Sequence, residues 1–294
     1  MTRRIPGWLQ KILGQGGAEF ADPEIARIAG GGGIEAAGLS DIGKERDANE
    51  DSYLCDVERR LFVVADGMGG RAAGDEASKA VIAALGGILT SEKIAEAMGG
   101  SDGSAVELLR ESFRKANEAV LAKAEEHPEW KGMASTVVVA LLDGGVLHIA
   151  NLGDSRAYLV RDGRARLLTK DHSVAAVLYE QGQFTEEEAR THPLRNQLTA
   201  SLGLPDPEDP AYASVELRSG DRVILCSDGL WDMLSDMEIA RLVCSYPDPE
   251  TAASALIDAA NDSGGLDNIT AVVAFIQSSS PVADVETAAE ALTA

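Results

Sequence analysis

Four short acidic motifs hold the residues of this chain that are best suited to do chemistry. They are NED at Asn49–Asp51, ADGMGG at Ala65–Gly70, CSDGLWD at Cys226–Asp232 and DN at Asp267–Asn268. Three of them adjoin an apolar run, as in LFVVAD, DRVILCSD and DNITAVVAF. Carboxylates gathered at such strand ends would repel one another strongly unless cations lay between them. One Asp-Gly pair alone is usually a turn, but four motifs together predict a divalent metal site.

The metal that suits such a site is magnesium or manganese. Carboxylate, carbonyl and water oxygens bind hard cations, whereas zinc prefers His and Cys, and the four His and three Cys show no ligand spacing. Two ions about 3.5 to 4 Å apart can deprotonate a water and hold both oxygens of a phosphoryl transfer. The glycines of Gly67–Gly70 let backbone groups approach an ion or anion closely. Hydrolysis of a phosphate ester is the implied reaction.

Apolar periodicity indicates which elements position these motifs. Strands are expected at about 52–57 and 61–66, helices at about 74–98 and 104–126, an antiparallel meander from 135 to 169, a strand at 221–227, helices at about 236–244 and 249–261, and a closing strand at about 268–276. Residues 173–205 are polar and helical. Strands in blocks with paired helices on either side suggest two face-to-face sheets flanked by helices.

Composition agrees with one enzyme domain in a chain of 294 residues that is 45% hydrophobic. The net charge of -22 argues against nucleic acid as a partner and favours divalent cations, although solubility alone explains many acidic surfaces. An odd count of three cysteines indicates reduced thiols and a cytoplasmic protein. The apolar runs fall short of the roughly 20 residues that cross a bilayer, so no transmembrane segment is expected.

Six motifs, in order and spacing, resemble those of the type 2C metal-dependent protein serine/threonine phosphatases. They are GLSDIGKERDANEDSY at 38–53, VVADGMGG at 63–70, GMAST at 132–136, NLGDSRAYL at 151–159, SDGLWD at 227–232 and DNIT at 267–270. The resemblance covers about residues 34–276 and is with the bacterial branch, because Met68 replaces the histidine of eukaryotic members. It implies an α+β fold, the αββα sandwich of two packed antiparallel β-sheets flanked by helix pairs.

The resemblance also implies roles for the core metal ligands. Asp66 would bridge two Mn²⁺ or Mg²⁺ ions, and the Gly67 carbonyl would bind the first. Asp228 and Asp267 would complete the ligands of the second. Two further residues, Glu50 and Asp51, match acidic positions that touch the cluster directly or through water.

A third, weaker ion and the substrate phosphate have their own matches in the family. Asp154 of GDSR, with Asp228 and Asp232, matches the site of a looser third ion. Arg46 matches the arginine that holds the substrate phosphate, and a guanidinium fork suits phosphate oxygens. Taken alone, Arg46 in KERDANED would be a solvated surface charge. Its place five residues before Asp51 favours the catalytic role, which it would share with Asp66 and Asp228.

The acid that protonates the leaving serine or threonine oxygen is not evident, because Met68 occupies the expected histidine position. A water acidified by the cations is one candidate. His172 is the other and lies where the family's flexible flap begins, at about 171–205, but its expected role is structural, at the start of a helix beside Ser173. His148, in VLHIANL, is expected to be a strand residue.

The chain is expected to have three parts. Residues 1–33 form a flexible extension, 34–277 the catalytic domain and 278–294 a polar tail. The chain is expected to be a cytoplasmic monomer that dephosphorylates phosphoprotein substrates and reverses a cognate serine/threonine kinase. Two alternatives stay open: hydrolysis of a small phosphate ester, and a binding module that sequesters a phosphoprotein. The second is disfavoured because degenerate members usually lose a metal ligand, and Asp66, Asp228 and Asp267 are all present.

Overall fold

The computed structural model describes residues 33–70, 73–99, 104–143 and 145–277, which form two antiparallel sheets. One sheet has the order β1 (Ile34–Asp41), β11 (Ile269–Ile276), β10 (Arg222–Cys226), β7 (Arg156–Arg161), β8 (Arg164–Leu167). The other has the order β2 (Asp51–Asp56), β3 (Leu61–Met68), β5 (Val137–Asp143), β6 (Val146–Leu152), β9 (Ala211–Glu216), and the short β4 (Ala134–Ser135) pairs with β3.

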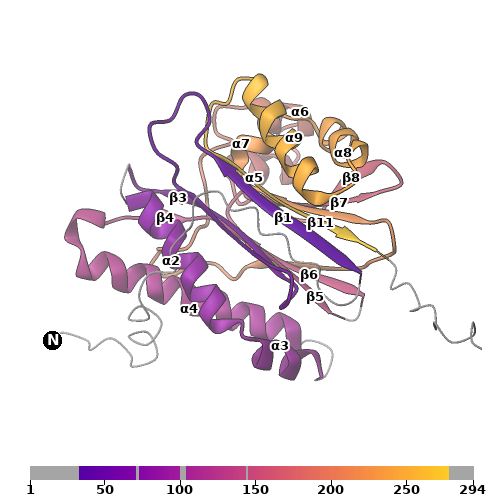
Figure 1. Cartoon of the computed structure of the whole chain (residues 1–294). Helices are drawn as coiled ribbons and strands as arrows, with labels where there is room; N and C mark the ends of the chain where they lie inside the picture. Colours follow the sequence, from indigo (N-terminus) through magenta and orange to yellow (C-terminus); the bar gives the residue numbers. More distant parts are fainter. Residues whose placement is uncertain (1–32, 71–72, 100–103, 144, 278–294) are drawn as a thin grey trace, which may run out of the picture.

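Helices cover the outer face of each sheet, so the molecule has four layers (Figure 1). Beside the β3 sheet lie α2 (Ala73–Ile88), α3 (Ser91–Met98), α4 (Ser104–Glu126) and the 3₁₀ turn η1 (Pro128–Trp130). Beside the β10 sheet lie α7 (Asp228–Trp231), α8 (Asp236–Ser245) and α9 (Pro249–Asp262). The predicted α+β class and αββα sandwich are confirmed.

Strand alternation explains why the sandwich has three apolar cores. In β3, Leu61, Val63 and Ala65 face the core under α2 and α4, whereas Phe62 and Val64 face the core between the sheets. Successive side chains of a strand point to opposite faces, so a strand that is apolar throughout is buried on both sides. The carboxylate at the end of such a strand is therefore held by packing on two faces.

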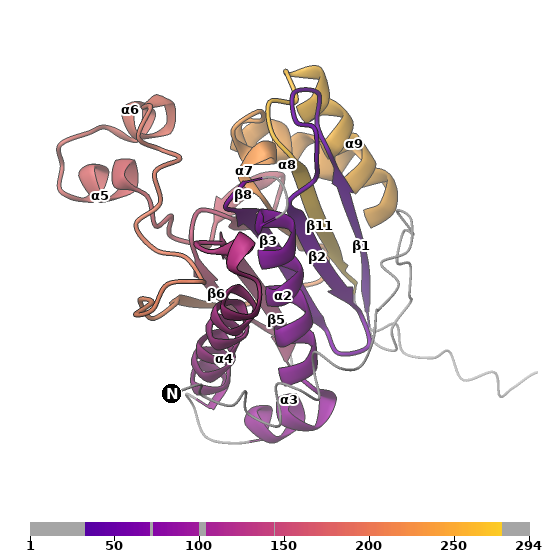
Figure 2. The same ribbon diagram turned by 90° about the vertical axis from the view of Figure 1, so that its left-hand side faces the viewer.

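The flap departs from the four layers. Its helices α5 (Val174–Glu180) and α6 (Glu186–Thr191) form a lobe that projects from the sandwich (Figure 2). Capping explains where they start: the hydroxyls of Ser173 and Thr185 accept from backbone N–H groups of the first turns. Of α5, only Ala175 is buried.

Two sequence expectations needed correction. The single helix expected at 74–98 is two helices, because the chain turns after Ile88 and Thr90 caps α3 by accepting from the Lys93 N–H. Strands β1 and β9 and the short helix α7 were not predicted. β1 contains Gly38 and β9 is exposed at alternate positions, so neither shows a long apolar run.

The predicted extension at 1–33 and tail at 278–294 lie outside the described residues, apart from Gly33. In the described part of the chain, no helix combines the length and the apolar character needed to cross a bilayer.

Candidate metal centre

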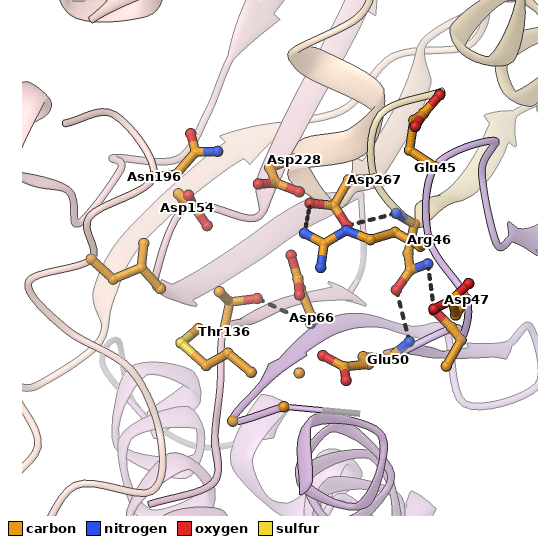
Figure 3. Close-up of a pocket in the computed structure, with 17 residues that line it drawn as sticks. Glu45, Arg46, Asp47, Glu50, Asp66, Thr136, Asp154, Asn196, Asp228 and Asp267 are labelled. Carbon is orange, nitrogen blue, oxygen red and sulfur yellow. Dashed lines mark hydrogen bonds and ion pairs between the residues drawn. The ribbon is translucent and has the colours of Figure 1, made fainter. Parts of the chain in front are cut away.

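The predicted site residues come together at one end of the two sheets. Asp51 pairs with Asp66 in the β2–β3 ladder, and Cys226 at the end of β10 pairs with Arg156 at the start of β7. Antiparallel pairing therefore brings the end of one strand beside the start of the next. Carboxylates distant in sequence meet at this edge around a pocket of about 520 Å³. Its lining includes Glu50, Asp66, Gly67, Asp154, Asp228 and Asp267, with Arg46 at the side (Figure 3).

Gly67 is required by the close approach of three backbone segments. A Cβ there would lie 1.9 Å from the Gly74 carbonyl oxygen and 2.8 Å from that of Glu50. The Gly67 N–H donates to the Glu50 carbonyl at 3.1 Å, which ties the NED motif to the ADGMGG motif. A side chain cannot be accommodated without moving the backbone, so the Gly67 position depends on the fold as well as on its chemistry.

A chain of hydroxyl groups connects Asp66 to the loop that carries Asp154. The Asp66 N–H donates to Thr136 Oγ1 at 3.1 Å, and Thr136 Oγ1 lies 2.7 Å from Ser155 Oγ. Gly153, with φ +101°, packs so closely on Thr136 that a Cβ would lie 2.6 Å from the threonine Cβ. Thr136 thus connects the backbone of Asp66 in β3 to the turn that carries Asp154.

Burial and mutual repulsion raise the pKa values of these acids. Burial is the largest cause for each, and it raises the pKa of Asp66 and Asp154 well above the usual range. Burial, followed by the charge of Asp267, raises the pKa of Asp228 to about 7. A cluster that resists ionisation in this way is stabilised by a cation, because the cation favours the charged form.

One atom of the cluster lacks a protein partner. Asp228 Oδ1 is buried and accepts no hydrogen bond from the described residues, a costly arrangement for a carboxylate. Within the described residues, no three His, Cys, Asp or Glu side chains already converge as a ready ligand set. The donors are nonetheless hard oxygen atoms of the kind that Mg²⁺ and Mn²⁺ bind, and the orphaned oxygen fits a bound cation.

Arg46 places a positively charged side chain beside these carboxylates. Its Nη2 lies 2.5 Å from Asp267 Oδ2, and the two side chains are 51% and 28% exposed. Figure 3 shows the guanidinium between Asp267 and Asp66. The loop that carries Arg46 is held by Asn268, whose Nδ2 donates to the Ile42 and Ala48 carbonyls. Arg46 is therefore positioned at the pocket, in contact with a predicted metal ligand.

Two predicted ligands, Asp51 and Asp232, are not among the described residues that line the pocket. Asp51 Oδ2 accepts from Ser227 Oγ and Thr270 Oγ1, both at 2.7 Å, and burial raises the pKa of Asp51 to about 8. Asp232 is paired with Arg195 of the flap, with Nη2 to Oδ2 at 2.8 Å. Both stay predictions as ligands: Asp51 lies opposite Asp66 in the β2–β3 ladder, and Asp232 is paired with the flap.

The histidine candidates lie outside the acidic pocket. His172 is buried, with Nδ1 3.2 Å from the Gly153 N and 3.1 Å from its carbonyl oxygen, and the next residue, Ser173, caps α5. His148 lies in β6, where Nδ1 is 2.5 Å from the Tyr212 hydroxyl. Neither is among the described residues that line the pocket.

Sequence reasoning missed several contributors to the site. Asn196 and Leu198 reach the pocket from the flap, and no local pattern marks them. Thr136 belongs to the GMAST motif, for which the sequence alone predicts no role. The partner arginine of Asp232 also lies in the flap, and only the fold brings the two together.

This chain is similar to known proteins over most of its length. The signature of the Protein phosphatase 2C family matches residues 43–258. The serine/threonine protein phosphatase PstP of Mycobacterium tuberculosis is 40% identical over 243 residues, which are 83% of this chain and 45% of PstP. The match thus spans less than half of that relative. Protein phosphatase PhpP of Streptococcus pneumoniae is 36% identical over 244 residues, 81% of this chain and 95% of PhpP.

A solved structure shows the same architecture. The catalytic domain of PstP in complex with two manganese ions superposes with a TM-score of 0.72 at 36% identity, and covers 83% of this chain and 99% of that one. The family signature covers most of the chain. The chain therefore belongs to the protein phosphatase 2C family.

Proposed function

We propose that this chain hydrolyses phosphoserine and phosphothreonine in proteins with the help of Mn²⁺ or Mg²⁺. The observation that carries the proposal is the pocket of about 520 Å³, where Asp66, Asp228 and Asp267 meet beside Arg46. The unpartnered Asp228 Oδ1 supports it further. The relatives named as serine/threonine phosphatases support the substrate class.

The residues present fit two core ions. Asp66, Asp228 and Asp267 would hold the ions together with the Gly67 carbonyl, and Glu50 would supply a further carboxylate at the pocket wall. The PstP catalytic domain in complex with two manganese ions supports the number and kind of the ions. When bound, the ions would supply an activated water and neutralise phosphate charge.

Arg46 would bind the substrate phosphate. It has one guanidinium that can face either Asp267 or a phosphate, and the fork geometry suits both. We propose that Arg46 leaves Asp267 when phosphate and cations are present. The described lining of the pocket contains no histidine, so we assign protonation of the leaving oxygen to water.

Finer assignments follow the same proposal. Asp154 and Asp228, with Asp232, would hold a third, weaker ion, supported by the raised pKa of Asp154 and its position at the pocket. The substrates would be phosphoproteins marked by a cognate serine/threonine kinase. The chain would act as a cytoplasmic monomer.

Metal removal tests the proposal. Activity on a phosphothreonine peptide and on p-nitrophenyl phosphate should vanish in excess EDTA and return with Mn²⁺ or Mg²⁺, because the nucleophile requires the cations. Full activity in EDTA would refute metal-dependent hydrolysis. Turnover of small phosphate esters without any phosphopeptide turnover would favour the small-ester alternative, and cation binding with neither activity would favour the binding module.

A further inference from the structure

Trp231 contacts the backbone of Asp154, a predicted metal ligand. Its side chain is 1% exposed, and its Nε1 donates to the Asp154 carbonyl oxygen at 3.0 Å. Trp231 is the last residue of α7, and Asp228 is the first. One short helix therefore carries a cluster carboxylate at its start and holds the backbone of a second cluster residue at its end.

Arg156 fixes the indole ring from the other side. Its guanidinium carbon lies 3.7 Å from the ring centroid, a stacked arrangement typical of arginine. The same guanidinium donates to Asp171 with Nη2 to Oδ2 at 2.6 Å, and to the Tyr158 hydroxyl at 3.0 Å. A buried guanidinium needs all these partners, so the stack has one well-defined geometry.

The stack lies apart from the reacting groups. Trp231, Arg156 and Asp171 line a separate cavity of about 400 Å³, between the flap and α7–α8. None of the three is in the described lining of the acidic pocket, whereas Asp154 is. Any effect of Trp231 on the pocket must therefore pass through Asp154 or through α7.

We propose that Trp231, held by Arg156, is a positioning residue that orients Asp154 for a divalent cation. The inference rests on the proposed function, in particular on a third ion at Asp154. Asp154 is 3% exposed and lies in the turn between β6 and β7, where the indole N–H fixes the carbonyl of its peptide group. Hydrogen bonds to the supporting atoms of a ligand commonly set cation affinity.

The test uses Trp231→Phe, which keeps an aromatic ring beside Arg156 but removes the N–H donor. Its matched control is Trp130→Phe, the same change at a ring that lies 5.4 Å from Lys123 Nζ on the far helical layer. Mn²⁺ binding to the full chain is followed by electron paramagnetic resonance of the free ion, and thermal melting checks the fold of each variant.

The expected result separates two classes of ion. The wild type should bind two tight ions and one weaker ion. Trp231→Phe should weaken the weaker ion about fivefold, the effect of one lost hydrogen bond, and should keep the two tight ions. Trp130→Phe should change neither class. In an Asp154→Asn background, Trp231→Phe should have no further effect on Mn²⁺ binding.

Three results would overturn the inference. One is a Trp231→Phe variant whose Mn²⁺ binding matches that of Trp130→Phe. Another is further weakening in the Asp154→Asn background. The last is a wild type that binds only two ions, which would remove the third-ion assignment while leaving metal-dependent hydrolysis intact. If Trp231→Phe does not fold, Arg156→Lys serves instead: it keeps the indole donor but loosens the ring, and should weaken the same ion by a smaller factor.

Discussion

The two sides of the pocket are held in different ways. Asp66 and Asp228 adjoin β3 and β10, whose apolar residues are buried on both faces. The flap at 171–205 has two helices of seven and six residues, and Ala175 alone of α5 is buried. A segment with few buried apolar contacts has low local stability. The molecule thus keeps its core carboxylates on rigid strands and leaves the neighbouring flap weakly packed.

On the flap side, polar contacts of two arginines attach the flap to the rest of the molecule. Arg195 pairs with Asp232, and Arg190 Nη2 donates to the Trp231 and Leu234 carbonyls at 2.9 and 2.8 Å. These ties bind the flap to α7 and to the segment that follows it. Partly exposed ion pairs contribute little each, so the contact between Arg195 and Asp232 holds the flap only weakly.

A substitution of Asp66, on the strand side of the pocket, should have the largest effect on activity. Asp66→Asn removes the carboxylate that would be shared by both core ions, so turnover of a phosphothreonine peptide should fall by a factor on the order of 10³ or more. Steady-state kinetics at saturating Mn²⁺ measures it. Asp258→Asn, an exposed residue of α9, is the control and should be fully active. A variant at Asp66 that retains a tenth of wild-type turnover would move the shared role elsewhere.

Arg46→Ala should come next. A charge-assisted hydrogen bond contributes about 1.5 to 3 kcal/mol, so KM for the phosphopeptide should rise by about 10- to 100-fold. kcat should change less if the guanidinium holds the phosphate equally in ground and transition states.

Two measurements accompany the Arg46 variant. Arg46→Lys should have an intermediate KM, since lysine keeps the charge but loses the fork. Mn²⁺ affinity should not fall in Arg46→Ala, because the change frees Asp267 from its ion pair. A fall in kcat at constant KM would instead assign Arg46 to the transition state.

The raised pKa values predict how stability of the chelated protein depends on pH. Asp51 and Asp228 have folded pKa values of about 8 and about 7, above the unfolded value of about 4. Their contribution to stability is present below the unfolded pKa and is lost as pH rises through the folded pKa. In EDTA, Tm should therefore drop by about 10 °C from pH 6 to pH 8.

Calorimetry with and without Mn²⁺ checks this dependence. Saturating Mn²⁺ should flatten it, because the cation stabilises the ionised carboxylates. Asp228→Asn should also reduce it in EDTA. A chelated protein whose Tm stays constant between pH 6 and pH 8 would show that these carboxyl groups are already ionised at pH 6.

The smallest effect should come from the flap. Arg195→Gln removes the pair with Asp232, so amide hydrogen exchange across 171–205 should accelerate by about two- to fivefold, as expected for a partly exposed pair. Arg161→Gln is the matched control, because Arg161 forms a similar pair with Asp221, at 2.6 Å, away from the flap. Equal exchange of the flap in both variants would show that Arg195 does not tie it down.

The sequence alone determined the fold class and the carboxylates of the pocket. Strand alternation and helical spacing are local patterns, and Asp66, Asp228 and Asp267 adjoin strands that such patterns reveal. The boundaries of helices and strands were less predictable. One expected helix is two, because Thr90 caps the start of α3. β1 and β9 were missed because they lack a long apolar run.

The contacts of each charged group follow from the packing of the fold. Arg46 and Asp267 are 221 positions apart, Trp231 and Asp154 are 77 apart, and Arg195 and Asp232 are 37 apart. No local pattern encodes such pairs, because they result from how strands and helices pack. The residue types that suit a metal site can thus be recognised in the sequence. Their hydrogen-bond and ion-pair partners depend on the packing that brings distant strand ends to one edge.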